Sequence, residues 1–141
     1  MIRKCWFFLF PVLTVAGLWA CRKEAPVQPA AGLPLVGTWQ YLERGYSPGS
    51  GYVIDQIPLN PAQTVNFTAQ HTVSTVSVTD GTFTAARTYR IDSAGSGNTL
   101  LLFDANQQEL ASPMEIRLEK DTLRLVPPCL EGCHFLFVRL K

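Results

Sequence analysis

Polar and apolar residues alternate one by one along much of the chain. Within residues 64–70, Val65, Phe67 and Ala69 are apolar and the residues between them are polar. Residues 113–119 repeat this pattern, with Met, Ile and Leu separated by charged residues. A period of two is expected for an antiparallel sheet with one buried and one solvated face. The pattern therefore predicts β-strands, and helical periodicity is almost absent.

Runs of this kind recur throughout the C-terminal three quarters of the chain. We expect strands at residues 35–44, 63–69, 71–79, 82–91, 98–104, 113–119, 122–127 and 133–140. Asp80-Gly81 predicts a hairpin turn, and the Gly- and Pro-rich residues 45–61 predict a long loop between the first two strands. About eight short antiparallel strands predict an all-β fold, a small up-and-down barrel, with a β-sandwich as the alternative.

Residues 1–34 lack this alternation. Arg3 and Lys4 precede an uncharged apolar run that ends at residue 20, the layout of a secretory signal. Residues 18–21, Leu-Trp-Ala-Cys, resemble the lipobox of bacterial lipoproteins. The resemblance implies cleavage before Cys21 and acylation of Cys21 with palmitate-type chains, which gives stable anchoring. We therefore expect a signal peptide at 1–20, a lipidated Cys and flexible Pro/Ala-rich tether at 21–34, and a barrel domain at 35–141.

The expected address is the cell envelope, with the protein held on the outer membrane through Cys21. The side of the membrane that it faces stays open. Twelve Lys and Arg against eleven Asp and Glu leave a net charge of +1, and like charges do not cluster. This composition argues against a nucleic-acid partner. Residues 92–94 and 121–123 resemble bacterial O-glycosylation triplets, and their modification also stays open.

The barrel domain begins with a recognisable motif. Gly37-Thr38-Trp39 matches the Gly-x-Trp signature in the first strand of lipocalins and related calycin-like barrels, and Arg139 occupies the matching place on the last strand. Residues 18–141 resemble the lipocalin-like lipoproteins of Bacteroidota, which end with a Cys-containing hairpin and a Phe-x-Arg strand. The resemblance implies that Trp39 plugs one end of the barrel and that Arg139 packs across its indole.

The same resemblance implies a non-catalytic binding module for a small apolar or glycan-like ligand. The candidate ligand contacts are Tyr41, Glu43, Tyr46 and Tyr52. Glu43 has the same strand parity as Tyr41, so it either points inward or lies in water at the open end of the strand. The alternative function is a structural or interaction lipoprotein with a filled barrel, whose partner is another envelope protein. An enclosed apolar cavity would separate the two.

The remaining cysteines lie in the segment Cys129-Leu-Glu-Gly-Cys133-His134. Cys5 leaves with the signal and Cys21 takes the lipid, so Cys129 and Cys133 face an oxidising compartment as a pair. Haem attachment usually needs Cys-x-x-Cys-His, with one residue fewer between the cysteines. A redox pair or a zinc clamp would also use two neighbouring cysteines. We expect a structural disulfide that flanks a hairpin turn, and no cofactor.

Metal and catalytic signatures are weak. A zinc site usually needs three or four ligands, and His71 is expected to face solvent, which leaves His134 with the cysteines alone. Residues 45–49, Gly-Tyr-Ser-Pro-Gly, match the Gly-x-Ser-x-Gly nucleophile elbow. That elbow uses the backbone N–H after the serine, and Pro48 has none. We therefore expect neither a metal site nor an enzyme.

Overall fold

A computed structural model describes residues 35–49, 51–93, 97–130 and 132–141. The expected signal peptide, Cys21 and tether lie outside the described residues. The elements are β1 (Gly37–Tyr46), β2 (Val53–Gln56), β3 (Thr64–Phe67), β4 (Val73–Val76), α1 (Gly81–Ala85), β5 (Thr88–Asp92), β6 (Thr99–Phe103), β7 (Met114–Glu119), β8 (Thr122–Val126) and β9 (His134–Arg139).

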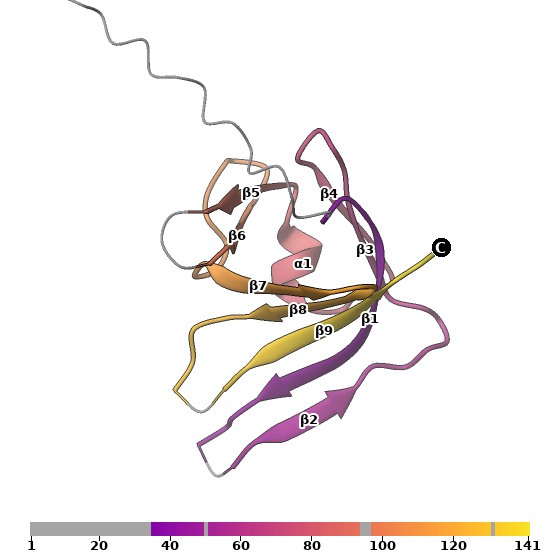
Figure 1. Cartoon of the computed structure of the whole chain (residues 1–141), viewed down its shortest axis with the longest axis vertical. Coiled ribbons are helices and arrows are strands. Elements are labelled where there is room, and N and C mark those ends of the chain that lie inside the picture. Colours follow the sequence, from indigo (N-terminus) through magenta and orange to yellow (C-terminus); the bar gives the residue numbers. More distant parts are fainter. Residues whose placement is uncertain (1–34, 50, 94–96, 131) are drawn as a thin grey trace, which may run out of the picture.

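The strands form one antiparallel sheet that curves into a nearly closed barrel (Figure 1). Around the barrel β1 is followed by β3 and β4, then by β5 to β9 in order, and β9 returns to pair with β1. The seam between β4 and β5 is held by a bridge between Thr72 and Thr88 and by the Tyr89 N–H, which donates to the His71 carbonyl at 2.9 Å. The expected all-β up-and-down barrel is confirmed.

The expected loop at 45–61 is wrong in its middle, where β2 forms. β1 is long enough to pair with β3 through its first half and with β2 through its second half. All four residues of β2 are exposed, so this strand has no buried alternate positions. The period-two signal of a half-buried strand is therefore absent from it, although Val53 and Ile54 are good strand formers.

A β-bulge in β1 changes the direction of the side chains that follow it. Tyr41 lies opposite Phe137 and Glu43 lies opposite Leu136, so Leu42 is the extra residue. A bulge shifts the alternation of side chains between the two faces of a sheet. Tyr41 is buried in the barrel interior, whereas Glu43 lies on the outer face. Of the two alternatives that the sequence left for Glu43, the inward direction is therefore wrong.

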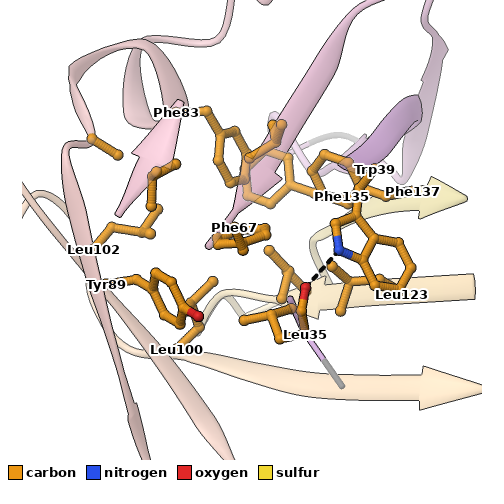
Figure 2. Close-up of a cluster of buried hydrophobic side chains, with 14 of the residues drawn as sticks. Leu35, Trp39, Phe67, Phe83, Tyr89, Leu100, Leu102, Leu123, Phe135 and Phe137 are labelled. Carbon is orange, nitrogen blue, oxygen red and sulfur yellow. Dashed lines mark hydrogen bonds between the residues drawn. The ribbon is translucent and has the colours of Figure 1, made fainter. Parts of the chain in front are cut away.

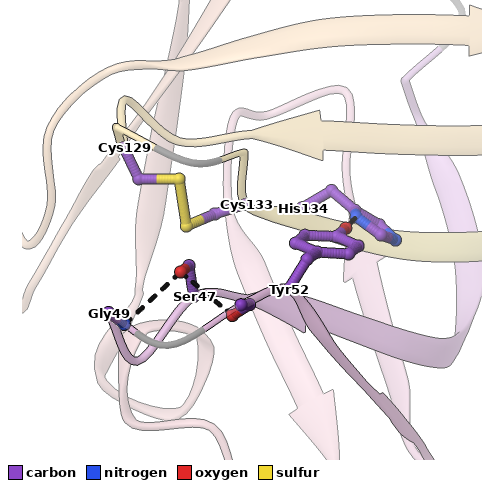
Figure 3. Close-up of a disulfide and its surroundings, with 7 residues drawn as sticks. Ser47, Gly49, Tyr52, Cys129, Cys133 and His134 are labelled. Carbon is purple, nitrogen blue, oxygen red and sulfur yellow. Dashed lines mark hydrogen bonds between the residues drawn. A yellow bond between two sulfur atoms is a disulfide. The ribbon is translucent and has the colours of Figure 1, made fainter.

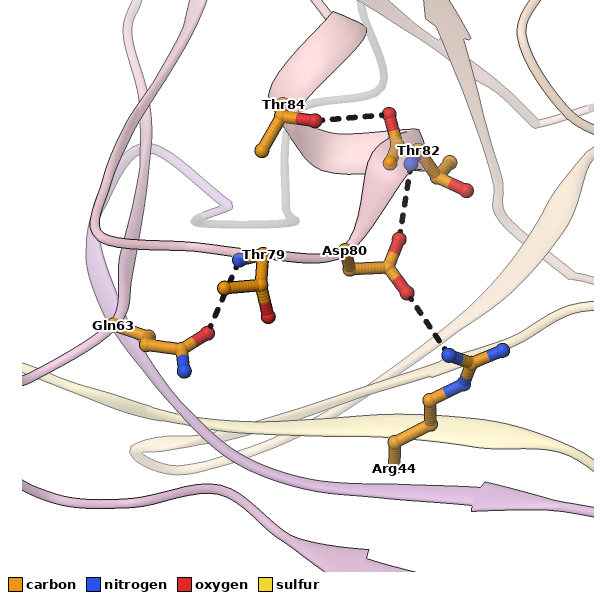
Figure 4. A network of polar contacts seen from close by, with 7 residues as sticks. Arg44, Gln63, Thr79, Asp80, Thr82 and Thr84 are labelled. Atoms are coloured by element: carbon orange, nitrogen blue, oxygen red, sulfur yellow. Dashed lines mark hydrogen bonds and ion pairs between the residues drawn. The ribbon is translucent and has the colours of Figure 1, made fainter.

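The expected Asp-Gly hairpin at residues 79–82 is also wrong, because α1 begins there. The Asp80 carboxylate accepts a hydrogen bond from the Thr82 N–H at 3.0 Å and caps the helix (Figure 4). Arg44 Nη1 lies 3.5 Å from the other Asp80 oxygen and ties the cap to β1. Aspartate is favoured both in tight turns and at helix N-caps. Burial of Phe83 on this short helix favours the second structure.

The barrel interior contains one continuous cluster of buried apolar side chains (Figure 2). Phe83 of α1 is fully buried, and its ring packs edge-on against Phe135 and Phe137 with centroid distances of 5.1 and 5.4 Å. Tyr41 stacks on Phe137 at 4.9 Å. The cluster consists of Leu35, Trp39, Tyr41, Val65, Phe67, Val73, Val78, Phe83, Ala86, Tyr89, Leu100, Leu102, Met114, Ile116, Leu123, Leu125, Phe135 and Phe137.

The Gly-x-Trp motif lies beside the end of the last strand. The Trp39 indole N–H donates to the Leu35 carbonyl at 2.8 Å, and the Arg139 guanidinium lies over the indole. Arg139 Nη1 also donates to the Val36 carbonyl at 2.8 Å. A Cβ atom at Gly37 would lie 2.5 Å from that nitrogen, and Gly37 has a φ of +141°. Glycine is therefore required at the first position of the motif.

Candidate functional site

A chain of hydrogen-bonded side chains crosses the outer face of the sheet beside β1. Glu43 Oε1 lies 2.8 Å from His134 Nε2, and the Gln56 amide donates to Glu43 Oε2 at 3.0 Å. The Tyr52 hydroxyl is hydrogen-bonded to His134 Nδ1. The Tyr52 and His134 rings lie side by side (Figure 3). Their ring centroids are 6.0 Å apart. Strands β1, β2 and β9 together position this chain.

Gly45 makes room for the contact between Tyr52 and His134. It lies on β1 as the register partner of His134 on one side and of Ile54 on the other. A Cβ atom at this position would collide with the Tyr52 hydroxyl and with the His134 ring. The two side chains therefore occupy the space that any other residue at position 45 would fill.

The hydrogen-bond partners of Glu43 and His134 indicate which of their atoms carry protons. The hydrogen bond from His134, and then that from Gln56, lowers the pKa of the Glu43 carboxyl below its usual 4.5. An ionised Glu43 can only accept, so His134 Nε2 carries a proton. In the tautomer with its single proton on Nε2, Nδ1 accepts the Tyr52 O–H. These hydrogen bonds thus link Tyr52, which is 48% exposed, to His134, which is only 4% exposed.

Two clefts lie on this outer face and share a pair of arginines. The first has a volume of about 350 Å³ and is lined by Tyr52, Arg117, Arg124, Val126, Gly132, Cys133 and His134. The second, of about 390 Å³, is lined by Arg117, Glu119, Thr122, Arg124 and Leu136. We refer to the first as the outer-face cleft. It brings the cation pair of β7 and β8 next to the Tyr52–His134 pair.

Cys129 and Cys133 form a disulfide with a Cα–Cα distance of 6.0 Å, as expected (Figure 3). It closes the turn between β8 and β9, and His134 follows it directly as the first residue of β9. Cys133 also lines the outer-face cleft. In the described part of the chain, His, Cys, Asp and Glu residues form no group of three or more that could hold a metal ion.

The candidate contacts named from the sequence separate into two groups. Glu43 and Tyr52 meet through His134, which the sequence had suggested only as a metal or haem ligand. Tyr41 is 2% exposed inside the barrel, its hydroxyl has no hydrogen-bond partner among the described residues, and burial raises its pKa. Tyr46 lies on the rim, under the Arg44 guanidinium at 5.4 Å.

The serine of the Gly-x-Ser-x-Gly match is held within a turn. Ser47 Oγ donates to the Gly51 carbonyl at 3.1 Å and accepts from the Gly49 N–H at 3.4 Å. Ser47 follows β1 and precedes β2, so the strand-to-helix geometry of a nucleophile elbow is not formed there.

A further cleft of about 560 Å³ lies at the seam between β4 and β5. His71 and Gln107 line it, and both have left-handed backbones, with φ of 59° and 61°. Each belongs to a tight turn, because the His71 N–H donates to Thr68 and the Gln107 N–H to Asp104. Turn geometry therefore accounts for these two backbones, and the expected solvent exposure of His71 is confirmed.

Comparison with protein families, with characterised proteins and with solved structures gave no match for this chain. Among the residues that the structure describes, there is no helix with the length and apolar character needed to span a membrane.

Proposed function

We propose that this protein is a lipid-anchored, non-catalytic protein of the bacterial cell envelope that binds its partner on the outer surface of a filled barrel. The single observation that carries the proposal is the packing of the interior. Phe83 of α1 packs inside the barrel against side chains of the paired strands β1 and β9, where its ring contacts Tyr41, Phe135 and Phe137. Protein interiors packed in this way hold few voids larger than a water molecule.

Packing of the interior favours the filled barrel of the second function over the internal ligand of the first. A lipocalin-like binding protein needs an enclosed apolar cavity of roughly 300 Å³ or more. Here the inward-facing aromatic side chains contact one another, and the outer-face cleft and the cleft beside it are lined mainly by exposed residues. An outer binding surface fits both observations.

The anchor is supported by the sequence alone. Residues 18–21 resemble a lipobox, and residues 22–34 have the proline-rich composition of a flexible tether. Metabolic labelling with palmitate tests it. The label is expected on the wild type, which should fractionate with membranes, and Cys21→Ala is expected to lose both. An unlabelled wild type would exclude the anchor.

The filled interior is tested with benzene, which binds engineered apolar cavities in protein cores. The chain from residue 22 contains every described strand with its partners, so it is suitable for NMR titration. The wild type is expected to show no saturable shift, whereas Phe83→Ala should open a cavity that binds benzene. Saturable binding of benzene or a fatty acid by the wild type would support the internal-ligand function instead.

A further inference from the structure

Arg117 and Arg124 face each other across β7 and β8. They are register partners, so their side chains start from directly opposite positions on the same outer face. Both side chains are exposed, and both line the outer-face cleft. Like charges directly opposite on a sheet destabilise it. The fold thus places two arginines at directly opposed positions of the sheet at some cost in stability.

The two arginines differ in how they are held. Arg117 donates from Nε and Nη2 to the two oxygens of Glu115, each at 2.9 Å. This bidentate contact orients the guanidinium and leaves its Nη1 hydrogens uncommitted, because the group has five donors. Arg124 makes no hydrogen bond or ion pair within the described part of the chain. Its full donor set is therefore available to a ligand.

Among the described residues, the carboxylates around the arginine pair either have a partner of their own or lie outside the cleft. Glu43 is bonded to His134 and Gln56, and Glu115 is bonded to Arg117. Glu119 lines the neighbouring cleft, two residues beyond Arg117 along β7 and on the side away from Val126. The described lining of the outer-face cleft itself has no carboxylate. Its charged lining residues are Arg117 and Arg124, and the charge of Arg124 also contributes to lowering the pKa of the Glu43 carboxyl.

The opposite wall of the cleft is fixed before any ligand arrives. The His134 ring is buried and bonded at both nitrogens, and the Tyr52 ring stacks on it with an interplanar angle of 28°. Gly45 provides the space for both rings. A site whose walls are already ordered loses less conformational freedom on binding.

We propose that the outer-face cleft binds a small oxyanionic ligand, through a carboxylate or phosphate group held between Arg117 and Arg124. The planar guanidinium fork matches both kinds of oxyanion. A cleft of about 350 Å³ lies at the lower end of the range for small-molecule sites. The proposal names a ligand class for the outer surface, and in that sense it rests on the proposed function.

The test is an NMR titration of the chain from residue 22 at constant ionic strength. The probes are inorganic phosphate, acetate and glucuronate, with glucose as the uncharged comparison. Saturable shifts at residues of the cleft are expected with at least one of the anions and not with glucose. Stronger binding of glucuronate than of acetate and phosphate identifies a sugar acid, and stronger binding of phosphate identifies a phosphate ester. Absence of a saturable shift with all three anions overturns the proposal.

Arg124→Gln is the decisive variant, and Arg90→Gln is its matched control. Arg90 is an exposed arginine on β5 that lies over Phe103, away from the cleft. Arg124→Gln should weaken anion binding about tenfold or more. It should also raise Tm in anion-free buffer by about 1–4 °C, because it removes the like-charge pair. Arg90→Gln should bind as the wild type does.

If Arg124→Gln and Arg90→Gln weaken anion binding equally, the affinity depends only on the net charge of the protein. This result also overturns the proposal. The benzene titration reports on the interior and not on this cleft. If no anion binds, the proposal of a filled barrel is unaffected. If an apolar ligand binds inside the barrel, the anion titration still tests the outer-face cleft.

Discussion

The guanidinium carbon of Arg139 lies 4.2 Å from the centre of the Trp39 ring. The two residues are register partners at the junction of the first and last strands. Their contact therefore fastens the two ends of the folded domain to each other. Gly37 keeps the space open through which the arginine reaches the Val36 carbonyl.

Trp39→Ala should cost about 3–5 kcal/mol of unfolding free energy, because it empties a fully buried site and removes the surface on which Arg139 rests. Urea denaturation measures the change. Arg90→Ala removes the more exposed Arg90–Phe103 stack and serves as the control, with a loss below about 1 kcal/mol. A loss of similar size for both variants would contradict the fastening role.

Gly45→Ala should cost about 1–3 kcal/mol, because the added methyl group collides with Tyr52 and His134. When Tyr52 and His134 are both alanine, the same change should cost nothing or stabilise, since alanine is preferred to glycine within a strand. Gly81→Ala, with open space around its Cβ position, is the neutral control. Thermal melts of the wild type, Gly45→Ala, the double alanine variant, the triple variant and Gly81→Ala test this, and additive effects would rule out the steric explanation.

Tyr41→Phe should leave stability at pH 7 unchanged or raise it by up to about 1 kcal/mol, because the buried hydroxyl has no described partner. The folded pKa of Tyr41 is raised above its usual 10.0 by burial, so the wild type should lose stability as the pH rises past 10. Tyr89→Phe is the contrast, since its hydroxyl donates to the Thr68 carbonyl at 2.8 Å. A loss for Tyr41→Phe as large as that for Tyr89→Phe would disprove the unpaired hydroxyl.

The pH dependence of the stability of Glu43→Gln tests the hydrogen bond between Glu43 and His134 on the outer face. The pKa of the Glu43 carboxyl in the folded protein lies below its usual 4.5. The ionised carboxylate therefore stabilises the folded state at neutral pH, and this stabilisation is lost as the pH falls through the folded pKa. The stability difference between wild type and variant should therefore shrink as the pH falls below 4.5. Denaturant titrations at several pH values measure it, with Glu119→Gln controlling for one exposed charge. A difference that stays constant over this range would contradict the His134–Glu43 bond.

The barrel was predictable from sequence because its strands are half-buried. Residues 114–119 and 122–126 alternate between buried and exposed side chains, as the pattern requires. β2 was missed because none of its residues is buried. The role of Asp80 was misjudged because aspartate suits both a turn and a helix cap, and the choice depends on where Phe83 can be buried.

The candidate site was harder to predict, because it depends on one bulge and on long-range pairing. Strand parity left an inward direction open for Glu43, and the extra residue Leu42 turns this side chain to the outer face. There it meets His134, which is 91 residues away in the chain. The pairing of Arg117 with Arg124 depends on the hairpin register, which the turn at residues 120–121 sets.

Native mass spectrometry of the protein purified from its own membrane tests the central claim most directly. The claim is a lipid-anchored barrel with a filled interior. It predicts a mass equal to that of the chain from Cys21 with its acyl groups, and no apolar molecule released on denaturation. A stoichiometric apolar molecule that leaves only when the barrel unfolds would contradict it.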